Sequence, residues 1–228
     1  MPSPRNAALP RLARGCGSPS GKPLVSKRSP GLRLRALLSL PAAEAARGLI
    51  GCLLVRRWPD REVRARIVEA EAYLGAGDPA AHVFRGRTPR TEPLFGPPGT
   101  LYVYFVYGMH HCLNLAVDGP GVPGCVLIRA AEPLEGSGLA PDALRGPGKL
   151  CRALGIDTAL SGRHLFEVGA PLTLRAGRPP AKVAVSGRVG IREATGRPLR
   201  FYDPGSPAVS ARPRAGISFE TARRSDKP

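Results

Sequence analysis

The stretch LYVYFVYGMHHCLN, residues 101–114, carries the strongest fold signal of this chain. With a period of two over 101–106, Tyr102, Tyr104 and Val106 share one face and Leu101, Val103 and Phe105 share the other, which is typical of a β-strand. Tyr107 breaks the alternation immediately before Gly108, and such a break predicts a turn or bulge. We therefore expect a strand whose tip directs Tyr107 and Met109 outward.

The same stretch holds three of the five tyrosines of a chain in which aromatic residues make up only 5%. Aromatic side chains on a strand and its tip, in a chain with a formal net charge of +17, favour stacking on bases beside a phosphate backbone. A buried tyrosine-rich strand explains the same residues. The stretch alone leaves both interpretations open.

Length and composition favour one folded unit with many loops. The 228 residues suit one large domain or two small ones, and 43% hydrophobic residues suffice for a core. The 28 glycines and 26 prolines predict numerous loops and little long helix. Because no linker or repeat interrupts residues 34–210, a single α+β domain is the simplest architecture.

The excess of positive charge points to an anionic partner. Lysine and arginine number 34 against 17 acidic residues, a balance typical of nucleic-acid binders. Ribosome-associated proteins and proteins of anionic membrane surfaces share it. Residues 1–43 contain no acidic side chain, and a basic tail of this kind is more often solvated than part of a site. We expect disordered basic segments at 1–32 and 213–228 around a domain at 33–212.

Cysteines and histidines show no pattern of a metal site. The five cysteines are odd in number and form no Cys-x-x-Cys pair, so we expect free thiols in a reducing cytosol. The four histidines lack metal-ligand spacing with a cysteine or carboxylate, and we expect no metal. No apolar run is long enough for a membrane span, and the N-terminus lacks the apolar segment of a secretory signal.

Propensity and turn residues predict the remaining elements. We expect a helix from 41 to 47 that Gly48 stops, a second helix from 146 to 154, and short strands with turns over 165–201. Longer strands are expected at 49–55, 63–73, 101–106, 113–117 and 124–130.

The strand at 63–73 places Glu69, Glu71 and Tyr73 on one face. Two carboxylates at this spacing repel each other unless one is protonated or paired. With His82 in the loop that follows, they could form a pocket that activates water beside an aromatic wall. Structural ion pairs with arginines are the alternative, and the pattern alone favours them.

The segment Gly146-Pro-Gly-Lys149 opens the second predicted helix. Lys149 could hold a phosphate with its ammonium and the nearby backbone N–H groups. An ordinary surface lysine explains it equally well. The phosphate loop of an NTPase and the Gly-x-Ser-x-Gly motif of a serine hydrolase are both absent.

Six segments of the chain, taken in order, resemble the alkyladenine (3-methyladenine) DNA glycosylase family. They are Arg66–Gly75, Asp78–His82, Gly99–Met109, Cys112–Asn114, Val126–Glu135 and Gly146–Cys151. The resemblance extends from about residue 34 to about 210, and six ordered motifs are far more specific than any one of them.

This resemblance implies a fold and an activity. The fold is a single mixed domain, α+β around an antiparallel sheet, with a protruding β-hairpin that enters the minor groove of DNA. The activity belongs to base excision repair: a damaged purine is flipped out of double-stranded DNA and its N-glycosidic bond is hydrolysed without metal or cofactor. Alkylated purines are the expected substrates, with deaminated and etheno purines as further candidates. The resemblance implies a monomer, cytoplasmic and, in a bacterium, associated with the nucleoid, without a membrane partner.

The resemblance also assigns the catalytic pair and the walls of the base pocket. Glu71 matches the general base that deprotonates and aims the attacking water, and Arg129 matches a residue that helps to bind backbone and water. The base-pocket walls match Tyr73, His82, Tyr104 and Asn114, of which Asn114 matches the position that disfavours the exocyclic amine of guanine.

The resemblance also concerns the tip of the hairpin. Tyr107 matches the residue that fills the gap left in the base stack, with Met109 beside it. Lys149 stays the candidate phosphate-binding residue because of its place at the helix start, independently of the resemblance. His110 departs from the aromatic residue often found at its position, which affects the stacking expected at the hairpin.

Two rival functions stay open from the residues themselves. An RNA- or ribosome-binding module explains the charge and the tyrosines but leaves Glu71 and His82 without a role. A lyase-type glycosylase needs an amine nucleophile, and Lys149 is the lysine of the motif core. Release of free base and borohydride trapping, respectively, distinguish these rivals from a hydrolytic glycosylase.

Overall fold

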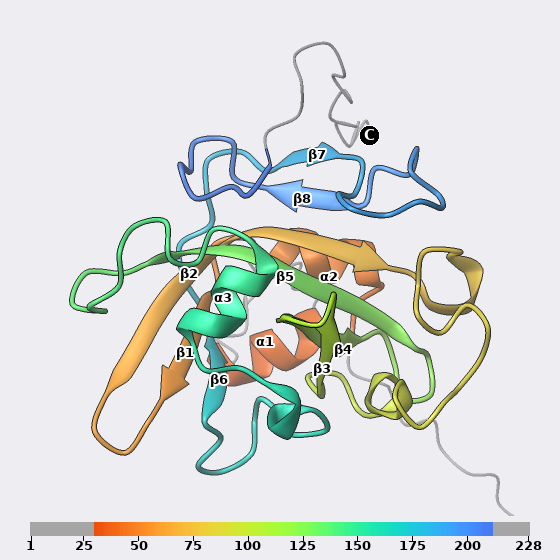
Figure 1. Cartoon of the computed structure of the whole chain (residues 1–228), viewed down its shortest axis with the longest axis horizontal. Helices are drawn as coiled ribbons and strands as arrows, with labels where there is room; N and C mark the ends of the chain where they lie inside the picture. The colour runs from red at the N-terminus through yellow and green to blue at the C-terminus, as the bar shows by residue number, and fades with distance from the viewer. Residues whose placement is uncertain (1–29, 212–228) are drawn as a thin grey trace, which may run out of the picture.

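Residues 30–211, which the computed structural model describes, form an antiparallel sheet with helices packed on it (Figure 1). The strands are β1 (Leu53–Arg57), β2 (Glu62–Tyr73), β3 (Leu101–Val106), β4 (His110–Val117), β5 (Gly124–Pro133), β6 (Leu172–Arg175), β7 (Ala184–Ser186) and β8 (Arg200–Tyr202). The helices are α1 (Pro30–Leu38), α2 (Ala42–Leu49) and α3 (Pro147–Ala153), with 3-10 turns η1 (Gly75–Gly77), η2 (Glu92–Phe95) and η3 (Thr158–Leu160). The predicted α+β class is confirmed.

The long strand β2 connects the parts of the sheet. The strand order is β3-β4-β5-β2-β1-β6, and β8 also pairs with β2 while β7 pairs with β8. Residues 62–66 of β2 pair with β1, whereas 69–71 pair with β8. The register between β2 and β5 shifts between Ile67 and Ala70. A bulge of this kind bends a strand and re-aims its side chains, and here it lies at Glu69.

The β3–β4 hairpin ends in the exposed turn that the sequence predicts. Tyr107 and Gly108 have φ angles of 52° and 68°, and the N–H of Met109 donates to the carbonyl of Val106 at 3.3 Å. Two successive positive φ angles are the pattern of a type I′ turn. Tyr107 is 82% exposed and Met109 is 69% exposed. The strand β4 starts at His110, three residues before the predicted start, because pairing continues up to this turn.

The two N-terminal helices correct two expectations. α1 was not predicted; Leu34 and Leu38 are buried in the main core. α2 continues through Gly48, so the predicted stop there is wrong. A Cβ at Gly48 would lie 2.4 Å from a methyl group of Leu37, so this glycine permits close packing of the helices. The predicted strand at 49–55 starts only at Leu53.

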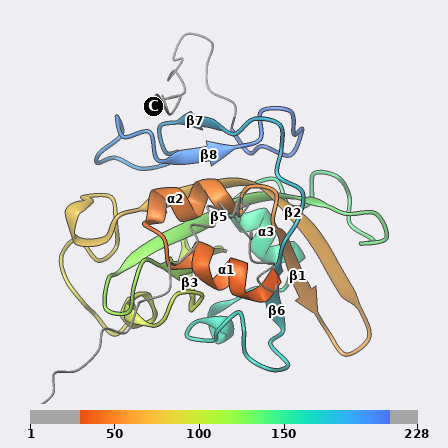
Figure 2. The ribbon, with the colours of Figure 1, turned by 180° about the vertical axis from the view of Figure 1, so that it is seen from behind.

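The helices cover different parts of the sheet. α3 faces the viewer in Figure 1, whereas α1 and α2 face the viewer in Figure 2, which is turned by 180°. α3 contacts β4 and β5, and α2 contacts β2. The remaining strands and α3 lie close to their predicted positions, and 165–201 forms short strands as expected.

Of the two tails that the sequence predicts, the structure describes only residues 30–32. α1 begins at Pro30, inside the segment 1–32 that the sequence marks as a tail. Residues 1–29 and the predicted tail at 213–228 lie outside the described residues. The described cysteines, at 52, 112, 125 and 151, are free and buried. Between residues 30 and 211, no helix is long and apolar enough to cross a membrane.

Candidate active site

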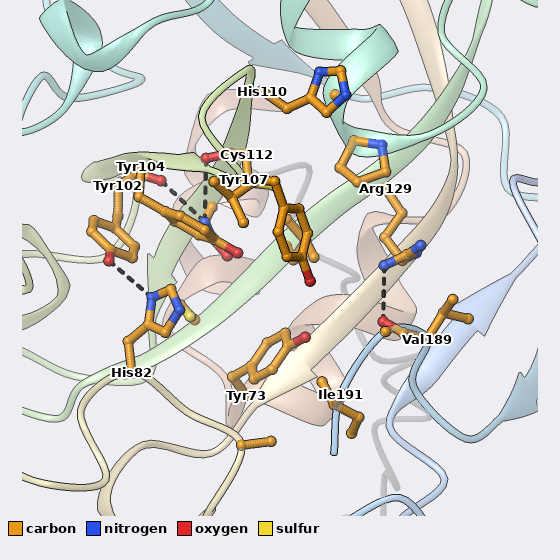
Figure 3. Close-up of a pocket in the computed structure, with 18 of the residues that line it drawn as sticks. Tyr73, His82, Tyr102, Tyr104, Tyr107, His110, Cys112, Arg129, Val189 and Ile191 are labelled. Carbon is orange, nitrogen blue, oxygen red and sulfur yellow. Dashed lines mark hydrogen bonds between the residues drawn. The ribbon is translucent and has the colours of Figure 1, made fainter. Parts of the chain in front are cut away.

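A cavity of about 440 Å³ lies between the β3–β4 hairpin, the end of β2, the start of α3 and the β7–β8 loop (Figure 3). This is the size of a small-molecule pocket. Its lining includes Tyr73, His82, Tyr102, Tyr104, Tyr107, His110, Asn114, Arg129, Gly148 and the run 189–193. Six residues with predicted roles in base binding, gap filling or catalysis thus line one cavity, although they come from distant parts of the chain.

One wall of the cavity is aromatic. The rings of His82 and Tyr104 meet edge to face with centroids 4.5 Å apart, and those of Tyr102 and Tyr104 are 5.4 Å apart. Nδ1 of His82 lies 2.9 Å from the Tyr102 hydroxyl. Burial and the nearby guanidinium of Arg90 lower the pKa of His82 below its ordinary value, so the imidazole is neutral at neutral pH.

Tyr102 is a site residue that the sequence analysis did not assign. It is buried, and burial raises the pKa of its hydroxyl to about 12, so it is a neutral hydrogen-bonding group at the back of the wall. Its hydroxyl orients the imidazole of His82. The signal was present in the sequence, because Tyr102 shares a strand face with Tyr104.

Glu71 lies beneath the cavity and is itself fully buried. Its carboxylate accepts hydrogen bonds from the hydroxyl of Tyr73 at 3.1 Å, Nη1 of Arg129 at 3.3 Å and the N–H of Val189 at 2.7 Å. All three donor residues line the cavity, whereas Glu71 does not. Burial raises the pKa of Glu71 above its ordinary value, and Arg129 and the Val189 N–H only partly oppose this.

Glu69 has a different environment. Its carboxylate pairs with Arg129 at 3.1 Å and with Arg200 at 2.7 Å, and it accepts the N–H of Ser210 at 2.6 Å. The alternative of structural ion pairs therefore describes Glu69. Arg129 bridges both carboxylates and also donates to the carbonyl of Val189 at 3.4 Å.

The position of Arg129 follows from the bulge. In the β2–β5 register, Glu69 is opposite Ala130 and Ala70 is opposite Ile128, so Arg129 has no partner residue. An unpaired bulge residue projects differently from its neighbours. The bulge thereby brings a β5 guanidinium onto two β2 carboxylates.

Asn114 is buried at the cavity wall, and its Nδ2 donates to the carbonyl of Tyr102 at 3.2 Å. This bond fixes the plane of the amide.

At the tip of the hairpin, Met109 does not line the cavity, although Tyr107 and His110 do. A Cβ at Gly148 would lie 2.9 Å from the ring of His110, so the glycine allows α3 to approach the hairpin.

Lys149 lies outside the cavity. Its ammonium pairs with Asp142 at 3.0 Å, and both side chains are largely exposed. The expected phosphate contact would therefore compete with this surface ion pair, and it stays a prediction.

The β7–β8 loop was missed by the sequence analysis. Its residues 189–193 line the cavity, and Val189 contacts Glu71. The only local sequence signal was a pair of glycines, 187 and 190, of which Gly190 has a φ of 78°. Among residues 30–211, no group of three metal-ligating side chains gathers anywhere.

Comparison with known proteins identifies the family of this chain. Residues 36–207 match the model of the methylpurine-DNA glycosylase family. The chain belongs to the methylpurine-DNA glycosylase family. The resemblance stated from the six motifs is thereby confirmed, and the match covers nearly all described residues.

Relatives in distant organisms support the assignment to the methylpurine-DNA glycosylases. A protein of Methanocella arvoryzae is 45% identical over 185 residues, covering 75% of this chain and 92% of that protein. One of Synechococcus elongatus is 47% identical over 180 residues, covering 78% and 90%. Both are provisionally named 3-methyladenine DNA glycosylases. The DNA-3-methyladenine glycosylase of Homo sapiens is 45% identical over 195 residues, covering 75% of this chain and 65% of the human protein.

Proposed function

We propose that this protein is a monofunctional DNA glycosylase that flips alkylated purines out of double-stranded DNA and hydrolyses their N-glycosidic bond. The observation that carries the proposal is the group formed by Glu71, Arg129 and Val189 beneath an aromatic-walled cavity. A nucleic-acid-binding module without catalysis would not need a buried carboxylate there. Family membership supports the same reaction.

The proposed chemistry uses a water held at Glu71. The carboxylate accepts a proton from this water as its oxygen bonds to C1′ of the sugar, and the electron pair of the C1′–N bond leaves with the purine. Nη1 of Arg129 lies 3.3 Å from the Glu71 carboxylate and 3.4 Å from the Val189 carbonyl, so the nitrogen and the carbonyl are a donor and an acceptor that could orient the water. The raised pKa of Glu71 suits a general base, because a more basic carboxylate takes the proton more readily.

The cavity walls explain why damaged purines would be chosen. A purine alkylated at N3 or N7 carries positive charge, which stacks well against the faces of Tyr73 and Tyr104. The same charge makes the base a good leaving group. We propose that Asn114 disfavours the exocyclic amine of guanine and that neutral His82 contacts the base edge.

Neutral purines are a finer part of the proposal. Deaminated and etheno purines lack the positive charge, so their release needs hydrogen bonds or protonation of the leaving group. The Tyr102–His82 pair lies where it can supply such a bond. We include these bases as secondary substrates.

The hairpin tip is the proposed DNA-inserting element. Tyr107 protrudes with a positive φ, which is strained for a bulky residue and therefore suggests a functional constraint. Extrusion of a base costs a few kcal/mol, and an aromatic plug in the vacated stack offsets part of it. Met109 lies beside the plug. The net charge of +17 favours the duplex backbone as partner, and we propose a monomer that acts in the cytoplasm at the DNA.

A glycosylase assay tests the proposal. The protein is incubated with duplexes that each contain one alkylated, deaminated, etheno or undamaged purine, and released free base and abasic strand are measured. Excision is expected to be fastest for alkylated purines and negligible for undamaged ones. Binding to all duplexes without base release would contradict the proposal and favour the nucleic-acid-binding alternative.

Tyr107→Ala is expected to weaken capture of the extruded nucleotide. Stacking contributes about 1–3 kcal/mol per base, so affinity for damaged duplex should fall about 5- to 150-fold. The loss should be greatest for lesions that remain well paired, because these need the plug most. Binding to a matched series of paired and mismatched lesions measures it. Equal losses across the series would count against insertion.

Lys149→Ala is expected to reduce DNA affinity and to leave the product unchanged, an intact abasic strand. One phosphate contact fewer should lower the slope of log affinity against log salt by about 1. Asp142→Ala is the matched control: it removes the competing carboxylate and should strengthen binding. A borohydride-trapped adduct that disappears in Lys149→Ala would establish the lyase alternative instead.

A further inference from the structure

Arg188 is a buried cation that the proposed hydrolysis does not use. It lies in the β7–β8 loop, and its side chain is fully buried, as is that of Asp78. Both terminal nitrogens face the Asp78 carboxylate: Nη1 pairs with Oδ2, and Nη2 donates to Oδ1 at 2.8 Å. Burying two charges is costly unless the geometry repays the lost hydration. The bidentate alignment of this pair is the geometry that such burial needs.

The pair joins three separate segments. Nη1 of Arg188 also donates to the carbonyl of Ala72 at 3.0 Å, near the end of β2. Asp78 accepts the N–H groups of Leu74 and Ala80, each at 3.2 Å, in the loop that follows β2. One bidentate ion pair thus connects the end of β2, the loop around η1 and the β7–β8 loop.

Each of these segments carries one residue of the site. Tyr73 follows Ala72 directly, His82 lies two residues beyond Ala80, and Val189 follows Arg188. Tyr73, His82 and Val189 are labelled around the cavity in Figure 3 and come from different strands and loops.

Arg188 also contacts Tyr73 directly. Its guanidinium carbon lies 4.6 Å from the centroid of the Tyr73 ring. Tyr73 lines the cavity, whereas Arg188 is buried and does not. The guanidinium therefore lies on the hidden side of the ring. A planar guanidinium stacks on aromatic faces, so the ring is supported from behind while the base would stack from the cavity.

We propose that Arg188, fixed by Asp78, is a positioning residue of the glycosylase reaction: it holds the Tyr73 ring and keeps the Val189 N–H on the Glu71 carboxylate. This inference rests on the proposed function. Neither Arg188 nor Asp78 lines the cavity, so the proposed effect of the pair passes through Tyr73 and Val189, which contact Glu71. The Val189 N–H lowers the pKa of Glu71, so loss of Arg188 should raise that pKa.

Arg188→Met tests the role. A displaced reactive group costs rate even when the displacement is small, about 100-fold for 1 Å, so we expect the single-turnover rate at saturating enzyme to fall about 100-fold. Affinity for damaged duplex should fall less, because the hairpin is untouched. The acid limb of the pH–rate profile should move to higher pH. Arg188→Lys keeps the charge but loses the planar guanidinium. Its rate and the position of its acid limb should lie between those of the wild type and Arg188→Met.

Arg66→Met is the matched control. Arg66 is likewise an arginine in ion pairs that connect β2 to other segments, here with Glu132 at 2.6 Å and Asp203 at 2.8 Å, but none of these residues lines the cavity. This variant should lower the melting temperature without moving the acid limb. A merely structural role for Arg188 predicts the same behaviour for both variants, and that result would overturn the proposal.

Amide hydrogen exchange adds a readout that needs no activity. Exchange at Val189 should accelerate in Arg188→Met and stay slow in Arg66→Met, and unchanged protection in both would overturn the inference. Should Arg188→Met fail to fold, Asp78→Asn and Arg188→Lys are measured in the same way. The wild-type protein is measured in the same assays. If it releases no base, this result counts against the proposed function. The exchange data still decide whether Arg188 holds the Val189 N–H in place.

Discussion

Glu71→Gln is expected to abolish base excision and to leave binding to damaged duplex nearly intact. The amide keeps the shape of the carboxylate and can still accept the Val189 N–H, but it cannot take a proton from water. General-base catalysis contributes roughly 10²–10⁴-fold, so the single-turnover rate should fall by at least the lower bound. Quenched single-turnover assays and equilibrium binding on the same duplex separate the two effects.

Glu69→Gln is the matched control for this prediction. Glu69 is equally buried and also pairs with Arg129, but its remaining partners are Arg200 and Ser210 and not cavity residues. Its loss should lower stability and reduce excision only mildly. An inactive Glu69→Gln variant together with an active Glu71→Gln variant would show that the general base has been assigned to the wrong carboxylate.

The pH dependence of the wild type belongs to the same test. As the proposed general base, Glu71 must be ionised, so the rate should fall as the pH drops through its pKa in the folded protein. Because burial raises that pKa, this fall should begin at a higher pH than for an exposed glutamate. The residual rate of Glu71→Gln should no longer fall at low pH.

Arg129→Met is expected to harm stability and rate together. It leaves Glu71 without its cation and Glu69 with Arg200 alone. Breaking a buried pair costs about 3–5 kcal/mol. A loss of about 3 kcal/mol should lower the melting temperature by about 6–12 °C for a domain of this size. Thermal unfolding of the variant measures this directly.

The rate of Arg129→Met should depend on pH in a specific direction. Arg129 lowers the pKa of Glu71, so its removal raises that pKa and leaves more of the carboxyl protonated at neutral pH. Excision should therefore be low at neutral pH and recover in part as the pH rises. Loss of rate that no pH restores would assign Arg129 to water or backbone binding alone. Arg129→Lys, which retains a charge, should show the smaller change in melting temperature.

Local pattern sufficed for the hairpin and much of the sheet. The period of two over 101–106 predicted β3, and the broken phase at Tyr107 predicted the exposed turn, since both depend on neighbouring residues alone. The prediction at Gly48 was wrong for the opposite reason: glycine usually weakens a helix, but here the glycine packs against Leu37 of the preceding helix. A contact between helices overrode the local preference.

The site was predictable only in part for the same reason. The shared face of Glu69 and Glu71 indicated a carboxylate pair, and the six motifs are the basis for proposing Glu71 as the general base. Nothing local distinguished the two, because Arg200 and Val189 reach them from more than 115 residues away along the chain. The β7–β8 loop carries no motif, so its contribution appears only once the chain has folded.

The shared edge of β2 has a consequence for synthesis. β8 pairs with residues 69–71 only after some 130 further residues have been made, and contacts of such separation form late because the long loop must first close. A chain that still lacks β7, β8 and the loop between them would hold the hairpin and the tyrosine wall, but Glu71 would lack the N–H of Val189 and Glu69 would lack Arg200. Nascent and prematurely terminated chains should therefore bind DNA without excising a base. Excision activity should require that β8 has been made and has paired with β2.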